Sequence, residues 1–515
     1  MGVNDVAHEY LEGMRLLLVT SSLTLVMFLG MMDISIIATA IPRITSDFHR
    51  LEHVGWYIGV YSLCSAALQP LTGKIFTFFS TKWSFLVFFL VFELGSCISG
   101  AAISSEMLIV GRAVAGLGYS GLTNGSLTII AAAIAPPKRP LSQIGMILGP
   151  ILGGVFTEFM SWRWCFYINL PLGAVTAISL VFTNIPDQIS KEPLSLDLVR
   201  RLLPQFDLIG FSLFAPAAVM GLLALQLGSS TYGWGSSPVI GLLCGCAATT
   251  AIFLIWEYRM GDEAMMPFAM IRKKAVWTAS LNFSLFMSVA VVAGNYMPIY
   301  FQSVRGLSPA MSGVYMLVSS ASQIMFVLLS GALMTRVGRL LPWSLGAGVF
   351  SAVACGLMST WAPHSSLATI FGFQVLNGGR GMGMQVPVLV VQHVLPPHEV
   401  AVGNSLIVFF ANSITAVMVT VGHVIFQESL VKELAVQTPS ITPAAATAAG
   451  GSGEAVRALA AATGTDVERL LLVYSVSFSK VFYLLAGLSV LMFLTAFGVG
   501  RIDLRGEKKK DPAVV

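Results

Sequence analysis

Long apolar stretches, separated by short polar connections, run through most of the 515-residue chain. A helix needs about 20 apolar residues to cross the hydrocarbon core of a bilayer, and the stretches have about that length. Their apolar residues are continuous rather than alternating, which favours helices over the strands of a membrane barrel. The pattern predicts fourteen spans, centred near residues 27, 64, 94, 120, 150, 176, 217, 247, 287, 320, 349, 379, 411 and 486.

Composition supports this fold class. Hydrophobic residues make up 56% of the chain and charged residues 10%, whereas a soluble domain has about 25% charged residues. We therefore expect an all-α polytopic membrane protein, a monomer, with the lipid bilayer as a partner. No P-loop, HExxH motif, nucleophile elbow or pair of catalytic carboxylates is present, so no enzyme activity, cofactor or metal is expected. No basic stripe with interleaved aromatic residues points to nucleic acid.

Lysine and arginine are concentrated in every second connection between the spans. Cytoplasmic loops of membrane proteins carry this excess of positive charge. The N-terminus (1–15) and the basic tail (501–515) are therefore both predicted to be cytoplasmic. We expect the plasma membrane as the location, with a vacuolar or vesicle membrane as the alternative.

Two short basic turns resemble each other and suggest an internal duplication, which is common in transporters. Residues 73–82 join spans 2 and 3, and residues 331–339 join spans 10 and 11; both open with glycine and carry threonine at the fifth position. The candidate residues of this cytoplasmic-turn motif are Gly73, Gly331, Arg336, Gly338 and Arg339.

The duplication predicts two six-span halves. The first is 16–186 and the second is 272–500, and 187–271 holds two inserted spans with their cytoplasmic linkers. Within the second half, 425–472 is rich in Ala, Thr, Ser and Gly. This composition predicts a flexible extracellular loop with one short helix around 454–462.

Three charged residues in the apolar spans are candidates for proton coupling. Asp33 lies in span 1, Glu93 in the middle of span 3 and Arg112 in span 4. A charge inside a membrane is costly and is by default a functional-site hypothesis. A carboxylate there could bind and release a proton, and a buried arginine needs a partner, which either Asp33 or Glu93 could provide.

Structural explanations remain open for each of these charges. Asp33 could lie at the wet outer end of its span, and Glu93 could make a hydrogen bond to a neighbouring helix. Arg380 in span 12 is another intramembrane cation, for which pairing with backbone carbonyl groups is at least as good an explanation.

Span 5 contains a glycine-rich motif. Glycines 145, 149 and 153 are four residues apart, so they share one helix face and permit close packing, and Pro150 favours a kink. The motif residues are Gly145, Gly149, Pro150, Gly153 and Gly154. Generic helix packing also explains such spacing.

Polar residues along three spans are candidates for the lining of a central cavity. They are Tyr61 and Gln69 in span 2, Asn295 and Tyr300 in span 9, and Gln374 and Gln385 in span 12. Hydrogen bonds between helices and the aromatic belts of membrane proteins explain the same pattern.

Together these segments resemble the major facilitator superfamily, and more narrowly its fourteen-span drug–proton antiporter branch, as in fungal toxin and multidrug efflux pumps. The similarity covers nearly the whole chain. It rests on residues 32–42 in span 1, 111–118 in span 4, 149–154 in span 5, 162–171 before span 6, and 298–306 and 381–385 in the second half. The resemblance implies that the arginine of span 4 takes part in proton coupling and that 149–154 is the antiporter motif, associated with export.

Two departures from the family pattern stand out. The first cytoplasmic turn has Thr77 and Phe78 where the superfamily usually has Asp and Arg. In addition, about ten residues are missing before the antiporter motif, so that Lys138 and Arg139 pass almost directly into it. From Leu141 to Gly149 is only about 12 Å of helix. Span 5 is therefore expected to be shortened near 140–145.

The sequence thus predicts a secondary transporter that exports a small amphipathic organic compound, such as a drug, toxin or secondary metabolite, in exchange for protons. Three alternatives stay open. They are uptake by proton symport, a membrane sensor that does not transport, and a variant inactivated by the short span 5.

Overall fold

The computed structural model describes residues 13–48, 54–133, 163–183, 185, 187, 191–192, 195–202, 206–230, 232–261, 264–449, 453–500 and 502. The described residues form helices and no strand. The first part of the chain forms α1 (Gly13–Phe48), α2 (Val54–Phe78), α3 (Thr81–Gly100), α4 (Ser105–Ala133), α7 (Trp164–Tyr167), α8 (Asn169–Phe182), α9 (Leu196–Leu202), α10 (Leu208–Ser230), α11 (Ser237–Met260) and α12 (Phe268–Arg272). The second part forms α13 (Lys274–Ser303), α14 (Pro309–Val337), α15 (Leu341–Met358), α16 (Leu367–Gly378), the 3₁₀ segment η5 (Gly379–Gly383), α17 (Val386–Val394), α18 (Val400–Gln437), α19 (Pro443–Ala449), α20 (Gly453–Thr463), α21 (Val467–Ala496) and η6 (Phe497–Val499).

The expected fold class is confirmed. In the described parts of the chain, nine helices are long and apolar enough to cross a membrane. Every predicted centre except that near residue 150 falls within a described helical element. Residues 134–162 lie outside the described residues. The shortened span 5 and the glycines of its motif therefore stay predictions, as does the total of fourteen spans.

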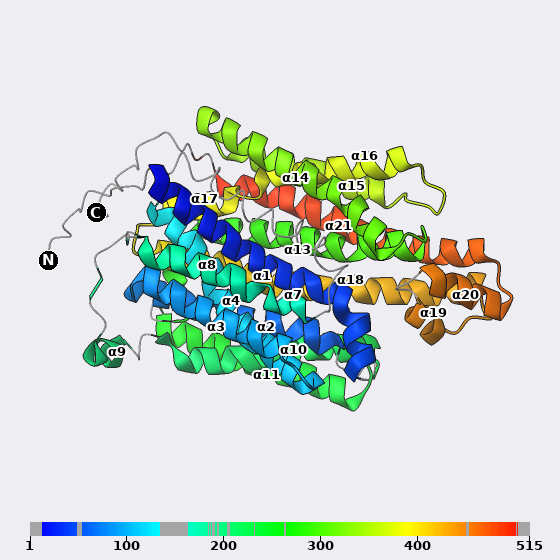
Figure 1. The fold of residues 1–515 in the computed structure, drawn as a ribbon, viewed down its shortest axis with the longest axis horizontal. Coiled ribbons are helices and arrows are strands. Elements are labelled where there is room, and N and C mark those ends of the chain that lie inside the picture. The colour runs from blue at the N-terminus through cyan, green and yellow to red at the C-terminus, as the bar shows by residue number, and fades with distance from the viewer. Residues whose placement is uncertain are drawn as a thin grey trace.

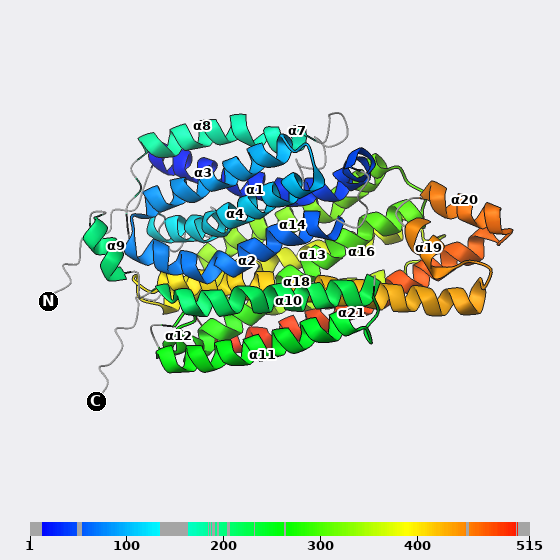
Figure 2. The same cartoon turned by 90° about the horizontal axis from the view of Figure 1, so that it is seen from below.

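The helices lie side by side along one direction (Figures 1 and 2). α1 begins and α21 ends at the same end of the bundle, which we call the termini end. At the opposite end α19 and α20 project beyond the bundle, together with the outer parts of α18 and α21. The first and the last long helix thus begin and end on the same side of the bundle; the cytoplasmic location of both termini stays a prediction.

The segment 425–472 differs from the expected flexible loop. α18 continues to Gln437, and α19 and α20 follow it; α20 matches the short helix expected around 454–462. Alanine is the best helix former, and the buried Val456 and Ala460 of α20 pack onto the core. Packing therefore orders a sequence whose small residues suggested a loop.

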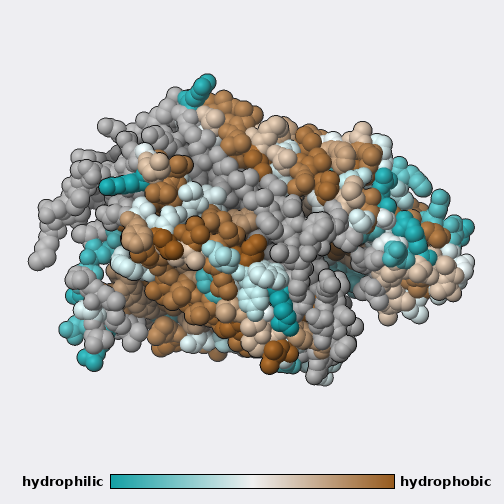
Figure 3. All heavy atoms as spheres, in the orientation of Figure 1, coloured by the Kyte–Doolittle hydropathy of each residue, from teal (hydrophilic) through white to brown (hydrophobic). Residues whose placement is uncertain are grey.

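The flanks of the bundle are apolar, and hydrophilic side chains gather at its two ends (Figure 3). On α3, the large exposed side chains Trp83, Val87, Leu90 and Leu94 follow one another at helical spacing along one face. In a soluble protein a continuous apolar face of this kind would be covered by another element. Here it is the surface that contacts lipid, which agrees with a multi-pass membrane protein.

The helices pack into two groups that meet at the termini end. One core unites α1 to α4 and α8, and a second unites α13, α15, α18 and α21. A third core joins them, because Leu127 of α4 packs among residues of α13, α17 and α18. α10 and α11 pair with each other, and α10 also contacts α2 and α18. The exact limits of the two predicted halves stay a prediction.

Candidate functional site

Asp33 and Arg112 form an ion pair in the interior of the first helix group. Nη1 of Arg112 donates to Oδ2 of Asp33, and each side chain is 1% exposed. Nε of Arg112 donates to the backbone oxygen of Tyr57 at 3.2 Å. The guanidinium also lies 4.3 Å from the centroid of the Tyr61 ring, a cation–π contact. Asp33 is therefore buried and paired with Arg112 rather than exposed to solvent.

Glycines on α4 bring Arg112 to this position. A Cβ atom on Gly116 would lie 3.0 Å from the Cα of Tyr61 in α2, and one on Gly118 would lie 2.6 Å from the Cα of Phe92 in α3. Such distances leave no space for a side chain. α4 therefore approaches α2 and α3 backbone to backbone, as small residues allow in membranes.

Glu93 of α3 lies close to this ion pair but does not join it. Both of its carboxylate oxygens are buried and, within the described part of the chain, make no hydrogen bond. A Cβ atom on Gly173 of α8 would lie 2.7 Å from the Glu93 Cδ atom, so the carboxylate is directed at α8. It interacts electrostatically with Asp33. The structure thus assigns Arg112 to Asp33, a choice that the sequence left open.

Polar side chains follow one face of α2 at intervals of four residues. Tyr61 and Ser65 are buried, and so is Gln69. The hydroxyl oxygens of the first two and both amide atoms of Gln69 make no hydrogen bond to the described residues. The amide of Asn404 in α18 is likewise buried without such a partner. These buried polar groups lack partners among the described residues, so they are candidates for contact with a ligand or with water.

Arg380 lies in the second helix group, on η5. Its Nη2 donates to Oε1 of Gln323 in α14 at 2.8 Å, and Nη1 reaches Oδ1 of Asn377 only at 3.5 Å. The pairing with backbone carbonyls that the sequence left open is not among these contacts. No carboxylate of the described residues forms an ion pair with it.

Glycines let the span that carries Arg380 pack closely on its neighbours. A Cβ atom on Gly379 would lie 2.7 Å from the Phe350 ring, and one on Gly381 would lie 2.6 Å from the backbone oxygen of Gln323. Pro387 then stands in the first turn of α17, where proline is well tolerated. The twelfth predicted span therefore consists of α16 and α17 joined by the 3₁₀ segment η5.

The remaining cavity candidates differ in their surroundings. Gln374 and Gln385 are buried, and their amide atoms make no hydrogen bond to described residues. Tyr300 instead belongs to an aromatic cluster with Trp361, and its hydroxyl donates to the Ala362 oxygen at 2.9 Å. Asn295 is exposed. Their role in lining a cavity stays a prediction.

The turn-motif residues lie at the termini end. A Cβ atom on Gly73 would lie 3.0 Å from the Cα of Val402 in α18, so this glycine allows the two helix groups to touch. Gly331 is buried in α14, and Gly338 ends that helix with φ +74°, a left-handed conformation that glycine adopts readily. Arg336 and Arg339 are exposed.

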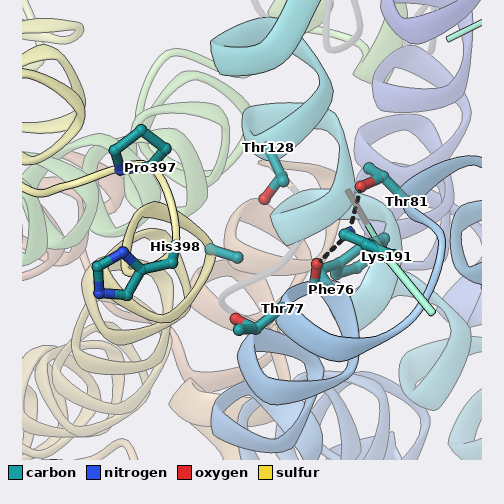
Figure 4. A pocket seen from close by; sticks show the side chains of 8 residues that line it. Phe76, Thr77, Thr81, Thr128, Lys191, Pro397 and His398 are labelled. Carbon is teal, nitrogen blue, oxygen red and sulfur yellow. Dashed lines mark hydrogen bonds between the residues drawn. The ribbon is translucent and has the colours of Figure 1, made fainter. Parts of the chain in front are cut away.

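A small pocket marks the contact between the two groups at this end (Figure 4). Its lining comes from α2, the first residue of α3, α4, the connection before α9, and the start of α18 with the turn before it: Phe76, Thr77, Thr81, Thr128, Lys191, Pro397, His398 and Ala401. Lys191 donates to the backbone oxygens of Phe76 and Phe79, at 2.7 Å each, and therefore caps α2. Burial lowers the pKa of Lys191, although Asp187 at 3.2 Å opposes the shift.

Two carboxylates that the sequence analysis did not single out are structural. Asp207 accepts from the backbone N–H of Gly210 at 2.9 Å and from the indole of Trp256 at 2.7 Å. Glu257 of α11 accepts from the backbone N–H groups of Met265 and Met266 at 3.2 and 3.0 Å. An aspartate directly before an apolar helix is a typical N-cap signal, which could have identified Asp207. The described residues contain no group of His, Cys, Asp and Glu that could hold a metal ion.

Comparisons with known proteins agree with this arrangement. The family model described as Major Facilitator Superfamily matches residues 23–420. The MFS-type transporter calB of Penicillium decumbens is 48% identical over 98% of this chain and 91% of its own length. The efflux pump mokI of Monascus pilosus is 43% identical over 97% of this chain and 94% of its own length.

Solved structures match at the level of the fold. The proton:xylose symporter XylE, bound to 6-bromo-6-deoxy-D-glucose, has a TM-score of 0.60 at 12% identity, covering 95% of this chain and 96% of its own. The human organic anion transporter MFSD10 has a TM-score of 0.58 at 13% identity, covering 94% and 100%. The chain therefore belongs to the major facilitator superfamily, as a multi-pass membrane transporter related to fungal efflux pumps and not an enzyme.

Proposed function

We propose that this protein exports a small amphipathic organic compound in exchange for protons. The observation that carries the proposal is the buried ion pair between Asp33 and Arg112. Breaking such a pair by removing one charge is strongly unfavourable. Protonation of Asp33 removes its charge, so the free energy of the conformation that contains the pair depends directly on proton binding.

The two oxygens of Asp33 have different roles in this mechanism. Oδ2 accepts from Arg112, whereas Oδ1 makes no hydrogen bond to the described residues. A proton arriving at Oδ1 neutralises the carboxylate while the contact at Oδ2 is still in place. Arg112 is then a buried cation with a neutral partner, and the helices that hold the pair gain less from staying together.

The contact between the two helix groups at the termini end provides the element that moves. In this structure α2 and α18 touch at Gly73, and Gln392 of α17 donates to the Leu127 oxygen of α4 at 3.3 Å. Alternating access requires these contacts to separate when the transporter opens at this end. α4 carries both Arg112 and Leu127, so one rigid helix links the proton site to the contact.

Two observations support an amphipathic substrate and the direction of export. The polar atoms of Tyr61, Ser65 and Gln69 are unpartnered among the described residues, within a bundle that is otherwise apolar. A compound with both apolar and polar parts fits such surroundings. Relatives at 43% identity include proteins named efflux pumps.

The test is transport by the purified full chain in liposomes. We would impose a pH gradient and follow a panel of radiolabelled neutral, cationic and anionic amphipathic compounds, with empty liposomes as the control for passive movement. We expect at least one compound to move against its gradient and in the direction opposite to the protons, and dissipating the gradient with nigericin to stop it. Movement in the same direction as the protons would establish symport, and no movement of any compound would contradict transport by this chain.

A further inference from the structure

We propose that Arg380 binds the carboxylate of an acidic amphipathic compound, so that the second helix group contains an anion site. The inference rests on the proposed export function, whose substrate it defines more closely. The chemistry is that of an aromatic or aliphatic organic acid with one free carboxylate. The site consists of the guanidinium of Arg380 on η5 with Gln323 of α14 and Asn377 of α16 beside it.

The first argument is the missing counter-charge. Arg380 is 7% exposed, and an arginine inside the membrane region is stable only with partners that compensate its charge. Its partners here are neutral amides, and its Nε atom makes no hydrogen bond to the described residues. Arg112 in the first helix group satisfies the same need with Asp33. Among its described residues the second group offers Arg380 no such anion.

The second argument is that some N–H donors of the Arg380 guanidinium have no good acceptor among the described residues. The contact between Nη1 and Asn377 is 3.5 Å long, beyond the usual range of N–H···O hydrogen bonds. The guanidinium therefore keeps its Nε donor, and most of the capacity of Nη1, for another acceptor. A carboxylate can accept from two guanidinium nitrogens at once, which gives a strong and directional contact.

The third argument is the backbone around Arg380. Four glycines stand between residues 378 and 383, and the helix tightens to 3₁₀ geometry there between α16 and α17. A stretch of 3₁₀ geometry inside a longer helix often marks a functional hinge. Glycines also lower the resistance of the backbone to small changes in φ and ψ, so η5 can adjust when a ligand reaches the guanidinium.

The test is a binding measurement on the full chain in phosphatidylcholine nanodiscs, without any pH gradient. The probes are radiolabelled 1-naphthaleneacetate and its neutral amide, 1-naphthaleneacetamide, which differ only in the charged group. The variants are Arg380→Gln and Arg380→Lys, and Arg259→Gln on the exposed end of α11 is the control for loss of an arginine.

We expect the unmodified chain to bind the acid about tenfold more tightly than the amide, as a charge-assisted contact predicts. Arg380→Gln should lose this difference by weakening the acid alone, Arg380→Lys should keep part of it, and Arg259→Gln should not change it. Equal binding of acid and amide by the unmodified chain would overturn the proposal, and that comparison needs no variant to fold. Failure to bind either probe would overturn it as well. Because no gradient is applied, the result is independent of proton-coupled transport.

Discussion

Arg112 and Arg380 both lie in the fourth span of their predicted halves, but their charges are balanced differently. Each follows a glycine, and each guanidinium contacts the second long helix of its group: α2 at Tyr57 for Arg112, and α14 at Gln323 for Arg380. Arg112 has a carboxylate from α1. Arg380 has only amides among the described residues. A charge balanced within the chain responds to protons, and a charge without an internal anion is suited to an anionic ligand.

The two spans that carry these arginines also differ in their helix geometry. α4 is continuous over its 29 residues, and it packs closely on α2 and α3. The other span changes to 3₁₀ geometry at η5, between α16 and α17. A continuous α-helix can transmit a change at Arg112 to its end at the contact between the groups, whereas a glycine-rich 3₁₀ segment allows local adjustment around a ligand. We therefore propose that the first group carries proton coupling and that the second recognises the charge of the ligand.

The largest effect is expected from removing one member of the ion pair. Arg112→Ala leaves the Asp33 carboxylate buried without its cation, so the folded chain should lose about 3–5 kcal/mol of stability. The measurement is thermal unfolding of the purified protein in detergent. A double variant with Asp33→Asn and Arg112→Gln should recover most of the loss, because no net charge then remains buried. If Arg112→Ala unfolds at the temperature of the unmodified chain, the pair does not stabilise this fold.

A strong effect is also expected from giving the second group an internal anion. Gln323→Glu places a carboxylate where an amide oxygen now accepts from Arg380 at 2.8 Å. This carboxylate should compete with an acidic ligand and lower its affinity about tenfold, while binding of the neutral amide stays the same. The measurement is the nanodisc binding assay with both probes. Unchanged affinity for the acid would show that Arg380 is not the anion site.

A smaller effect is expected at the carboxylate beside the ion pair. The oxygens of Glu93 are buried without hydrogen bonds to the described residues, so Glu93→Gln removes a poorly compensated group. We expect a gain in stability of about 1 kcal/mol and continued transport driven by the pH gradient. Thermal unfolding and the liposome assay measure the two quantities. A folded Glu93→Gln protein without proton-driven transport would move the proton site from Asp33 to Glu93.

The smallest effect is expected at the contact between the groups. A Cβ atom on Gly73 would clash with Ser405 Oγ and lie 2.9 Å from the Ser405 Cβ and 3.0 Å from the Cα of Val402. Gly73→Ala should therefore separate α2 and α18 slightly and favour opening at the termini end. Spin labels at positions 80 and 398, in a chain without other cysteines, should show a longer distance distribution. Gly372→Ala in α16, where a Cβ atom meets nothing within 4 Å, is the matched control. An unchanged distribution would show that this contact is not sensitive to packing at Gly73.

The sequence predicted the fold class and the places of the helices because hydropathy over about 20 residues is a strong signal. It named Asp33, Glu93 and Arg112 for the same reason, since charges stand out in apolar runs. It left open which carboxylate pairs with Arg112, because that depends on how α1, α3 and α4 pack. The 3₁₀ segment η5 was not predicted, since glycines and a proline in an apolar run do not lower hydropathy enough to mark a change of helix geometry.

The continuation of α18 to Gln437 and the helix α19 were not predicted, whereas α20 was. Alanine, threonine, serine and glycine give no apolar period, so their composition suggested a loop. The buried positions of α20 are held by residues from distant parts of the second group, and such contacts are invisible along the chain. From the sequence, Lys191 was only one of the positive charges of a cytoplasmic linker. Its role as the cap of α2 depends on a tertiary contact, which the sequence does not show.

The most direct test of proton coupling through Asp33 compares two modes of transport in the same liposomes. The first assay measures accumulation of substrate driven by a pH gradient, and the second measures exchange of labelled for unlabelled substrate without a gradient. Both are applied to the unmodified chain and to Asp33→Asn. Glu192→Gln, which changes an exposed carboxylate, is the control. Asp33→Asn should lose at least about tenfold in driven accumulation, equal to about 1.4 kcal/mol, and keep exchange, while Glu192→Gln keeps both. Accumulation by Asp33→Asn at the rate of the unmodified chain would contradict the account.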